Sequence, residues 1–281
     1  MTDAGAASRL ALFAREDVRD AVRERQAHVL GVLFVLLGGG LAYSAGRTAQ
    51  MVSAEIELVG RLVGPLALLI PLVALGLVAP AIVEKRATGA LTVLLGLPFS
   101  RRTVVLGTVL GRTIVIAAGA LASLIVAVPI ALMMGVSVDP VDLLGVALAF
   151  GVLAVTFTAI AVAISTLTRT STRASFGAFG TYVVFVFGLW AQLPMLALYV
   201  VSGFEYPETV PTWVEFVSAL NPMTAFTNLG GAVSPLENVA FSSVPTEPAV
   251  YERPSAALVI LLAWIGVSVW VSILRFERTD L

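Results

Sequence analysis

Long apolar runs, separated by polar segments of varying length, dominate the pattern of hydrophobic and polar positions along the chain. A helix needs about 20 apolar residues to cross the hydrocarbon core of a membrane. Six runs approach or exceed that length, and they cover residues 28–46, 62–83, 113–134, 141–167, 174–202 and 256–274. A helix satisfies its own backbone hydrogen bonds in lipid, and these runs lack the alternating polarity of membrane β-strands. We therefore predict an all-α integral membrane protein, a single transmembrane domain over residues 1–281 with six transmembrane helices.

Composition and the N-terminal segment support this fold class. The 281 residues are 58% hydrophobic and 12% charged, whereas soluble domains carry about 25% charged residues. Residues 2–26 are too long and too mixed in charge for the basic region of a cleavable signal peptide, so we expect the first apolar run to be retained. The chain has no cysteine and one histidine, His28, which excludes disulfides, a thiol nucleophile and a histidine metal cluster.

The charged residues are divided unevenly between the segments that would lie on the two sides of a membrane. If both termini are cytoplasmic, all 17 basic residues except Arg47, Arg61 and Arg253 fall in cytoplasmic segments. Acidic residues gather in the segment before the last apolar run: Glu205, Glu208, Glu215, Glu237, Glu247 and Glu252. Because basic residues are retained on the cytoplasmic side, we predict that both termini are cytoplasmic.

The N-terminal segment 5–26 has the pattern of an amphipathic helix. Its apolar residues share one helical face: Leu10, Ala14, Val18, Ala21 and Val22. A row of arginines at four-residue spacing lies beside that face: Arg15, Arg19 and Arg23. Such a helix can lie in the membrane interface with its arginines at lipid phosphates. The acidic residues of the same segment favour the alternative, a solvated charged helix: Asp17, Asp20 and Glu24.

The segment 84–102, between the second and third runs, is more apolar than a cytoplasmic connection requires. Charged residues bracket a predicted short helix at about 87–97, which Pro98 ends, and Ser100 is placed to cap the next helix. Its surplus of leucine predicts that either the bundle or another protein covers it.

The segment 203–255 is predicted to be an extracytoplasmic cap. It is rich in proline and has room for short helices at 212–220 and 222–229. Three aromatic residues would pack this cap on the outer face of the bundle: Trp213, Phe216 and Phe226.

Several classes of chemistry are missing from the sequence. There is no G-x-x-x-x-G-K-[ST] phosphate-binding loop and no H-E-x-x-H motif, so the chain is predicted neither to bind ATP through a P-loop nor to be a metalloprotease. Arg112 and Asp142 stand at the edges of predicted helices rather than at mid-membrane, which argues against a self-sufficient ion-driven transporter. Two Gly-x-x-x-Gly pairs, Gly60/Gly64 and Gly107/Gly111, allow either close helix packing or dimer formation.

The segment from Glu84 to Arg101 carries a resemblance to a known family. An acidic residue, a glycine, a run of leucines, a proline and a Ser-Arg pair follow in order: Glu84, Gly89, Leu91, Leu94, Leu95, Pro98, Ser100 and Arg101. With the amphipathic N-terminal helix, the tight turn at 135–140 and the large segment before the last run, nearly the whole chain resembles the membrane subunits of ABC-2-type exporters. Within that family it is similar to the NosY-like six-span permeases.

This resemblance implies a partner and a set of contact residues. A coupling helix within residues 84–97 would dock on a separate ABC ATPase subunit, in a complex of two permease chains, expected as a homodimer, and two ATPase chains. Four charged residues would form the rim of that contact: Glu84, Lys85, Arg86 and Arg101. Three leucines would fill or flank its centre: Leu91, Leu94 and Leu95. Gly89 and Pro98 complete the expected coupling segment, and the first, second and fifth runs would meet at the dimer interface.

We therefore expect the transmembrane subunit of an ATP-driven exporter in a prokaryotic cell membrane. ATP and Mg²⁺ would bind the partner, and the chain itself would have no cofactor, metal ligand or catalytic residue and no nucleic-acid partner. A scaffold that docks an ATPase without a translocation path is the alternative, and a membrane-embedded enzyme is disfavoured because no catalytic set is present. The sequence does not reveal the substrate, and no His, Cys or Met cluster supports a copper- or sulfur-related role.

Overall fold

The computed structural model of the chain describes residues 3–52, 56–90, 99–205, 209–233, 236 and 249–278, and this part is built of helices. The α-helices are α1 (Asp3–Arg23), α2 (Arg25–Val52), α3 (Leu58–Val78), α4 (Ala81–Ala87), α6 (Arg101–Met133), α7 (Pro140–Leu167), α8 (Ser171–Phe185), α9 (Leu189–Val201), α10 (Thr212–Ala219), α11 (Pro222–Asn228) and α12 (Pro254–Glu277). Two short 3₁₀ turns are η1 (Leu229–Gly231) and η3 (Val250–Glu252).

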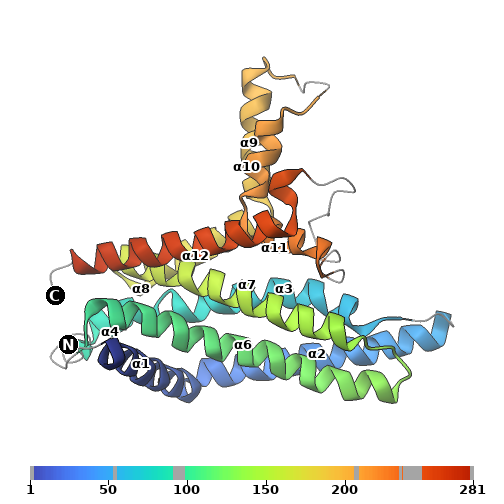
Figure 1. Cartoon of the computed structure of the whole chain (residues 1–281), viewed down its shortest axis with the longest axis horizontal. Coiled ribbons are helices and arrows are strands. Elements are labelled where there is room, and N and C mark those ends of the chain that lie inside the picture. The colour runs from blue at the N-terminus through green and yellow to red at the C-terminus, as the bar shows by residue number, and fades with distance from the viewer. Residues whose placement is uncertain are drawn as a thin grey trace.

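The long helices α2, α3, α6, α7 and α12 run roughly along one axis and form a bundle (Figure 1). Helix α3 lies at its centre, where most of its residues are buried against α2, α6, α7 and α8. Both ends of the chain lie at the same end of this bundle, which we call the termini end (Figure 1). A bundle with its termini on one side agrees with an even number of membrane crossings.

Five helical stretches in the described residues are long and apolar enough to cross a membrane. They cover the runs predicted at 28–46, 62–83, 113–134, 141–167 and 256–274, except that α6 ends one residue early at Met133; α3 and α4 together make the second. The fold class predicted from the sequence is therefore confirmed.

The prediction of one continuous helix over 174–202 was wrong in detail. Helices α8 and α9 are separated by a short break and differ in direction by 67°. Gly188 in this break has a φ of +75°, in the left-handed region that side chains other than glycine rarely adopt. The pair is either one broken crossing of the membrane or a re-entrant element. The break was not predicted, because a uniformly apolar sequence gives no sign of a change in helix direction.

The predicted tight turn between the third and fourth runs is confirmed. Helix α6 ends at Met133, α7 begins at Pro140, and Asp139 caps α7 by accepting from the N–H groups of Val141 and Asp142. Ser137 in this turn exchanges backbone hydrogen bonds with the connection between α2 and α3, through Ile56 O at 3.2 Å and Leu58 N at 3.0 Å. These bonds hold the two connections together at the end of the bundle opposite the termini.

The segment predicted as a cap over 203–255 is only partly packed on the bundle. Helix α11 packs on α12, and Phe226 is buried with its ring 6.3 Å from the ring of Phe150 in α7. Helix α10 instead packs against α9, and the two project sideways from the bundle (Figure 1). Trp213 and Phe216 are consequently exposed, which corrects the prediction that they pack on the bundle.

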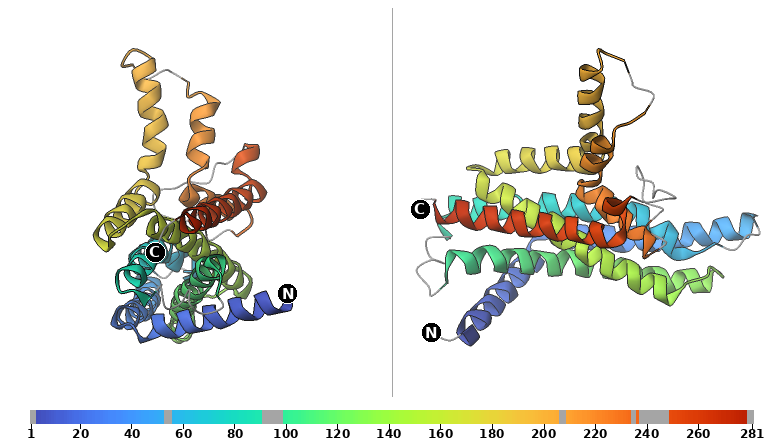
Figure 2. Two further views of the ribbon diagram at one scale, coloured as in Figure 1. Left: turned by 90° about the vertical axis from the view of Figure 1, so that its left-hand side faces the viewer. Right: turned by 45° about the horizontal axis from the view of Figure 1, so that its top comes forward.

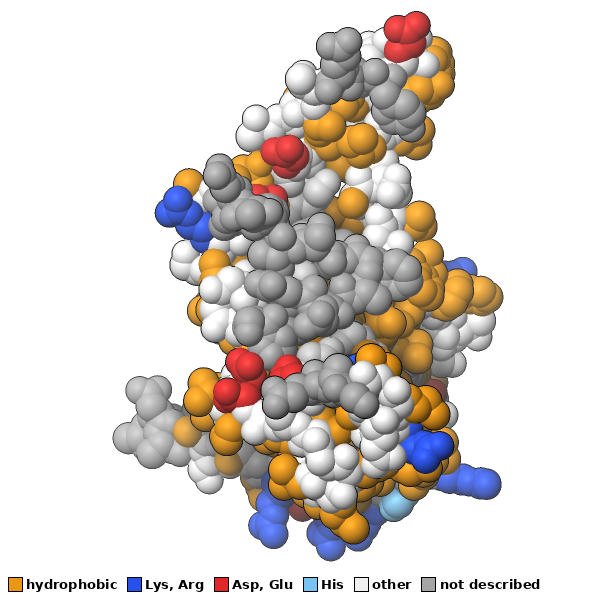
Figure 3. Space-filling model, turned by 90° about the vertical axis from the view of Figure 1, so that its right-hand side faces the viewer, with side chains coloured by type: hydrophobic (Ala, Val, Ile, Leu, Met, Phe, Trp, Pro, Cys, Tyr) orange, Lys and Arg blue, Asp and Glu red, His pale blue; other side chains and the backbone are white. Residues whose placement is uncertain are grey.

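The face of the molecule opposite the termini end mixes apolar and acidic side chains. Acidic side chains are scattered on it from the tip of the projecting helices down to the bundle, and basic ones gather mainly near its lower margin (Figure 3). This pattern agrees with the uneven distribution of charge along the sequence.

Helix α1 lies across one side of the bundle at the termini end and packs on the first half of α6 (Figure 2). Its buried face consists of Phe13, Ala14, Asp17 and Ala21, whereas Val22 is half exposed. The observed buried face is therefore rotated from the predicted one. It includes Ala14 and Ala21 as predicted, lacks Val22, and contains Asp17.

The Gly107/Gly111 pair is the surface of α6 that receives α1. A Cβ added at Gly111 would lie 3.0 Å from the backbone oxygen of Ala14 and 3.0 Å from Asp17 Cβ. A Cβ at Gly107 would overlap the ring of Phe13. Of the two uses left open for this motif, the structure shows close packing within the chain.

Replacing Gly111 by alanine is expected to weaken the docking of α1. The added methyl group meets backbone, which cannot move aside, so the free energy of unfolding should fall by about 1 kcal/mol. Gly151→Ala in α7 is the matched control, because a Cβ there has open space and alanine favours a helix. Thermal unfolding of the purified protein in detergent, with limited proteolysis of α1, measures both variants. An equal stability of the two would contradict this packing.

Candidate functional site: a buried ion network beside a groove

Helix α4 continues α3 after a break at Ala79 and Pro80, and it is held by the end of α7. The N–H groups of Ile82 and Val83 both donate to Ser165 Oγ, at 3.1 and 3.3 Å. The first N–H groups of a helix have no partner within it, and the buried hydroxyl of Ser165 supplies one. Helix α4 is therefore fixed to α7 rather than free to rotate about the break.

The predicted coupling residues on α4 point in different directions. Glu84 is exposed, Lys85 Nζ reaches α1, and Arg86 Nη1 lies 3.5 Å from the backbone oxygen of Thr168 after α7. Helix α4 ends at Ala87, and Gly89 follows with a φ of +73°. The glycine of the family pattern thus stands where the backbone becomes left-handed.

The remaining predicted coupling residues come at or before the start of α6 in the chain. Ser100 caps α6 as predicted, with its Oγ 3.1 Å from the N–H of Thr103. Arg101 donates to the last backbone oxygens of α12, those of Phe276 at 2.6 Å and Glu277 at 3.0 Å. Leu91, Leu94, Leu95 and Pro98 lie outside the described residues.

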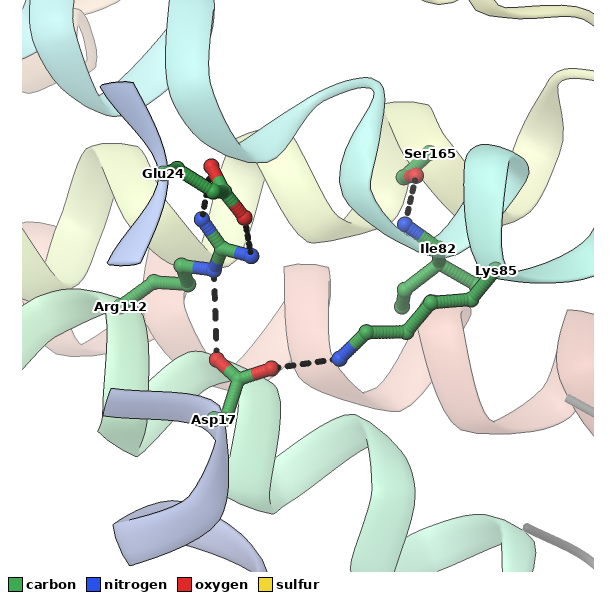
Figure 4. Close-up of polar contacts among 6 residues, drawn as sticks. All are labelled: Asp17, Glu24, Ile82, Lys85, Arg112 and Ser165. Carbon is green, nitrogen blue, oxygen red and sulfur yellow. Dashed lines mark hydrogen bonds and ion pairs between the residues drawn. The ribbon is translucent and has the colours of Figure 1, made fainter. Parts of the chain in front are cut away.

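An ion network joins α1, α4 and α6 (Figure 4). Asp17 in α1 lies between two cations: its Oδ1 is 2.6 Å from Lys85 Nζ, and its Oδ2 is 3.2 Å from Arg112 Nε. The first contact is a hydrogen bond, whereas the second is an ion pair without hydrogen-bond geometry. Glu24, between α1 and α2, accepts a hydrogen bond from each terminal nitrogen of Arg112, at 2.8 and 3.2 Å.

The centre of this network is removed from solvent. The side chain of Asp17 has no exposed surface, that of Arg112 is 3% exposed, and that of Lys85 is 19% exposed. A buried charge is tolerated only when it is paired, because it has lost its hydration. The two carboxylates and two cations balance each other, so the network is neutral as a whole.

This network was not predicted from the sequence. Asp17 and Glu24 were interpreted as signs of a solvated helix and Arg112 was placed only at a membrane edge, so none of the three was named as a site residue. A signal was available, because Asp17 follows Phe13 by four residues and precedes Ala21 by four. An acid in a buried stripe at helical spacing indicates a specific cationic partner. The identity of that partner depends on tertiary contacts.

A groove runs beside the network at the termini end. A cavity of about 650 Å³ is lined by Glu24, Glu84, Lys85 and Arg112 on its charged side and by residues of α3 and α8 elsewhere, Phe176 and Phe179 among them. A second cavity of about 560 Å³ between α2 and α3 shares Gln26, Gly76 and Leu77 with the first. Together they form a partly open groove between α2, α3 and α8, with charge at the termini end. Among the described residues, no three His, Cys, Asp or Glu side chains are grouped as metal ligands.

Comparison with known proteins identifies the family. Residues 11–281 match the family described as ABC-2 family transporter protein. The chain belongs to this family. The permease is 31% identical over 279 residues to a protein of Stutzerimonas stutzeri named "Probable ABC transporter permease protein NosY", with 95% of this chain and 97% of the relative aligned. It is 29% identical over 278 residues to a protein of the same name from Pseudomonas aeruginosa, with the same coverage of both chains.

The permease is therefore a multi-pass membrane subunit of a prokaryotic ABC transporter, and the resemblance described from the sequence is confirmed. Membership of this family implies a membrane setting and an ATPase partner. The ion network and the groove lie at the end of the permease that carries the segment 84–102, where the ATPase contact was predicted.

Removing the central carboxylate should destabilise the permease. In Asp17→Asn, Lys85 loses its anionic partner and Arg112 keeps only that of Glu24, so the free energy of unfolding should fall by about 3 kcal/mol. Asp20→Asn, on the exposed side of the same helix, should change it by less than about 0.5 kcal/mol. Thermal unfolding in detergent at neutral pH compares the two variants. A similar loss in both would show that the network contributes no stability.

Proposed function

We propose that the permease couples ATP hydrolysis on a separate ATPase subunit to export of a substrate across the cell membrane. ATP and Mg²⁺ would bind the ATPase, and the termini end would face the cytoplasm. The observation that carries this proposal is the attachment of α4. This helix follows the central helix α3 in the chain, and contacts with Ser165 and Asp17 hold it in place. It leads directly into the apolar segment predicted to bind the ATPase.

The attachment of α4 provides a route for movement. A displacement of the segment 84–97 by the ATPase would move Lys85, and through Asp17 it would act on α1 and α6. Packed helices shift between discrete arrangements rather than deforming continuously. In this proposal the rim residues Glu84, Lys85, Arg86 and Arg101 have different roles. Glu84 is exposed for contact, whereas Lys85, Arg86 and Arg101 also bind within the permease.

The groove supports a dimer of two permease chains. Large apolar side chains are exposed on the three helices that border it, among them Val29 of α2, Leu72 of α3 and Phe176 of α8. The charged residues at its termini end would be costly to leave against lipid. A second copy covering α2, α3 and α8 would shield them and enclose a path, in keeping with the expected meeting of the first, second and fifth runs.

The contact with the ATPase is tested by changing its predicted apolar centre. Leu91→Asp combined with Leu94→Asp should reduce co-purification of the ATPase by at least tenfold, because two charges would enter an apolar contact. Leu12→Asp in α1, which also places a charge at an exposed leucine, is the control and should leave co-purification unchanged. Undiminished recovery of the ATPase with the double variant would show that this segment is not the coupling helix.

The orientation is tested separately. A reporter inserted after Phe99 should respond as a cytoplasmic domain, because the basic residues gather at the termini end. A reporter inserted after Val138, in the α6–α7 turn at the opposite end of the bundle, should respond as an external domain. The reverse result at both positions would exclude the proposed orientation while leaving the family assignment intact.

A scaffold that docks an ATPase without moving a substrate shares the contact surface but needs no enclosed path. ATPase rates of the reconstituted complex in liposomes separate the two functions when candidate substrates are added. Stimulation by a substrate supports transport, and its absence across amphipathic and polar candidates favours the scaffold.

A further inference from the structure

A third cavity at the termini end lies on the other side of α4, away from the ion network. It has a volume of about 520 Å³ and is bordered by α4, the end of α7 and the end of α12. Four arginines line it: Arg86, Arg169, Arg275 and Arg278. The other lining residues that the structure describes are Thr166, Leu167 and Thr168, so this part of the wall contains no carboxylate.

Arg86 forms the enclosed part of this wall. Its side chain is half-buried, and its Nε and Nη2 atoms are shielded from solvent without a hydrogen-bond partner among the described residues. Nη1 makes a long contact of 3.5 Å with the backbone oxygen of Thr168. Arg275 lies close enough to Arg86 for their charges to repel. Shielded guanidinium nitrogens beside a like charge are unfavourable unless an anion occupies the cavity.

The helix ends around the cavity do not balance this charge. The C-termini of α7 and α12 each contribute roughly half a negative charge, against four guanidinium groups. The last backbone oxygens of α12 already accept from Arg101 at the start of α6, and Glu277 forms an ion pair with Arg102 at 2.9 Å. Even without Arg275, the charges of Arg86, Arg169 and Arg278 exceed those of the two helix ends by roughly two.

The arginines lie at the depth of a membrane surface. The apolar part of α7 ends at Leu167 and that of α12 at Leu274, so Arg169 and Arg275 follow directly after the membrane-crossing residues. Helix α12 also has few buried residues, and several of its large apolar side chains are exposed, among them Val259, Leu262 and Trp270. The cavity is thus next to a membrane-crossing helix with an exposed apolar face, at the end of its apolar stretch, where lipid phosphates are expected.

We propose that this cavity binds the phosphate group of an anionic phospholipid from the membrane leaflet at the termini end. The planar guanidinium of Arg86 can donate through Nε and Nη2 to two phosphate oxygens, and the other arginines add charge at the rim. Basic pockets between membrane helices bind anionic head groups in this manner. The bound lipid would tie α4 to α7 and α12. This proposal needs the membrane setting but not the proposed ATP coupling.

The test measures lipid binding to the purified permease without the ATPase. The permease in detergent is titrated with phosphatidylglycerol or phosphatidylcholine, and bound lipid is counted by native mass spectrometry. Phosphatidylglycerol should bind more tightly than phosphatidylcholine. Arg86→Gln should weaken the binding of phosphatidylglycerol about fivefold, as expected for one basic residue near a lipid surface.

Two further variants control for folding and position. The double variant Arg169→Gln with Arg278→Gln changes only exposed side chains. It should also weaken the binding of phosphatidylglycerol, by about fivefold or more. Arg253→Gln, exposed just before the opposite end of α12, is the matched control and should leave binding unchanged. Equal binding of phosphatidylglycerol to all of these variants would overturn the proposal.

Two competing ligands are distinguished in the same experiment. Glycerol phosphate is added as a soluble source of the same group. If it binds with equal affinity and the same dependence on Arg86, the site serves a soluble phosphate and the lipid assignment is wrong. If Arg86→Gln leaves lipid binding unchanged but lowers ATPase co-purification, a carboxylate of the ATPase is the ligand, and the lipid proposal is again overturned.

Discussion

The buried carboxylate of Asp17 organises the termini end of the permease, because it needs cationic partners and finds them on two different helices. Lys85 comes from α4 and Arg112 from α6, and these helices are separated in sequence by the segment 88–100. A carboxylate without exposed surface would be strongly unfavourable if either helix moved away. The positions of α1, α4 and α6 are therefore linked by one side chain, and any force applied to the connecting segment acts on all three.

Close packing makes this arrangement possible. Asp17 reaches Arg112 only because α1 lies directly on α6, and it lies there because Gly107 and Gly111 have no side chains. Helix α4 is oriented in the same way by a small polar contact, the hydroxyl of Ser165 at its first N–H groups. Glycines and one serine thus determine the geometry in which the charged residues meet. In lipid, apolar side chains gain little by packing on one another instead of on lipid tails, so such contacts matter more than apolar burial.

Neighbouring residues on α4 face two different environments. Lys85 points to α1 and borders the groove between α2, α3 and α8, whereas Arg86 points to the ends of α7 and α12 and borders the arginine-lined cavity. Successive residues on a helix differ by about 100° in direction, so consecutive charges can serve opposite sides. In the proposed transporter, α4 would lie between the proposed dimer-facing groove and a lipid site at the periphery. Its movement would be sensitive to both.

The apolar pattern determined by itself that the chain is a helical membrane protein, because the length of an apolar run and the need to satisfy backbone groups in lipid are local properties. The tight turn at 135–140 and the cap at Ser100 also follow from local chemistry. Tertiary structure decided the change of direction in 174–202, the exposure of Trp213 and Phe216, and the burial of Asp17. Each of these depends on which helix lies opposite. Asp17 and Arg112 are almost one hundred positions apart in the chain, and the sequence does not indicate that they form a pair.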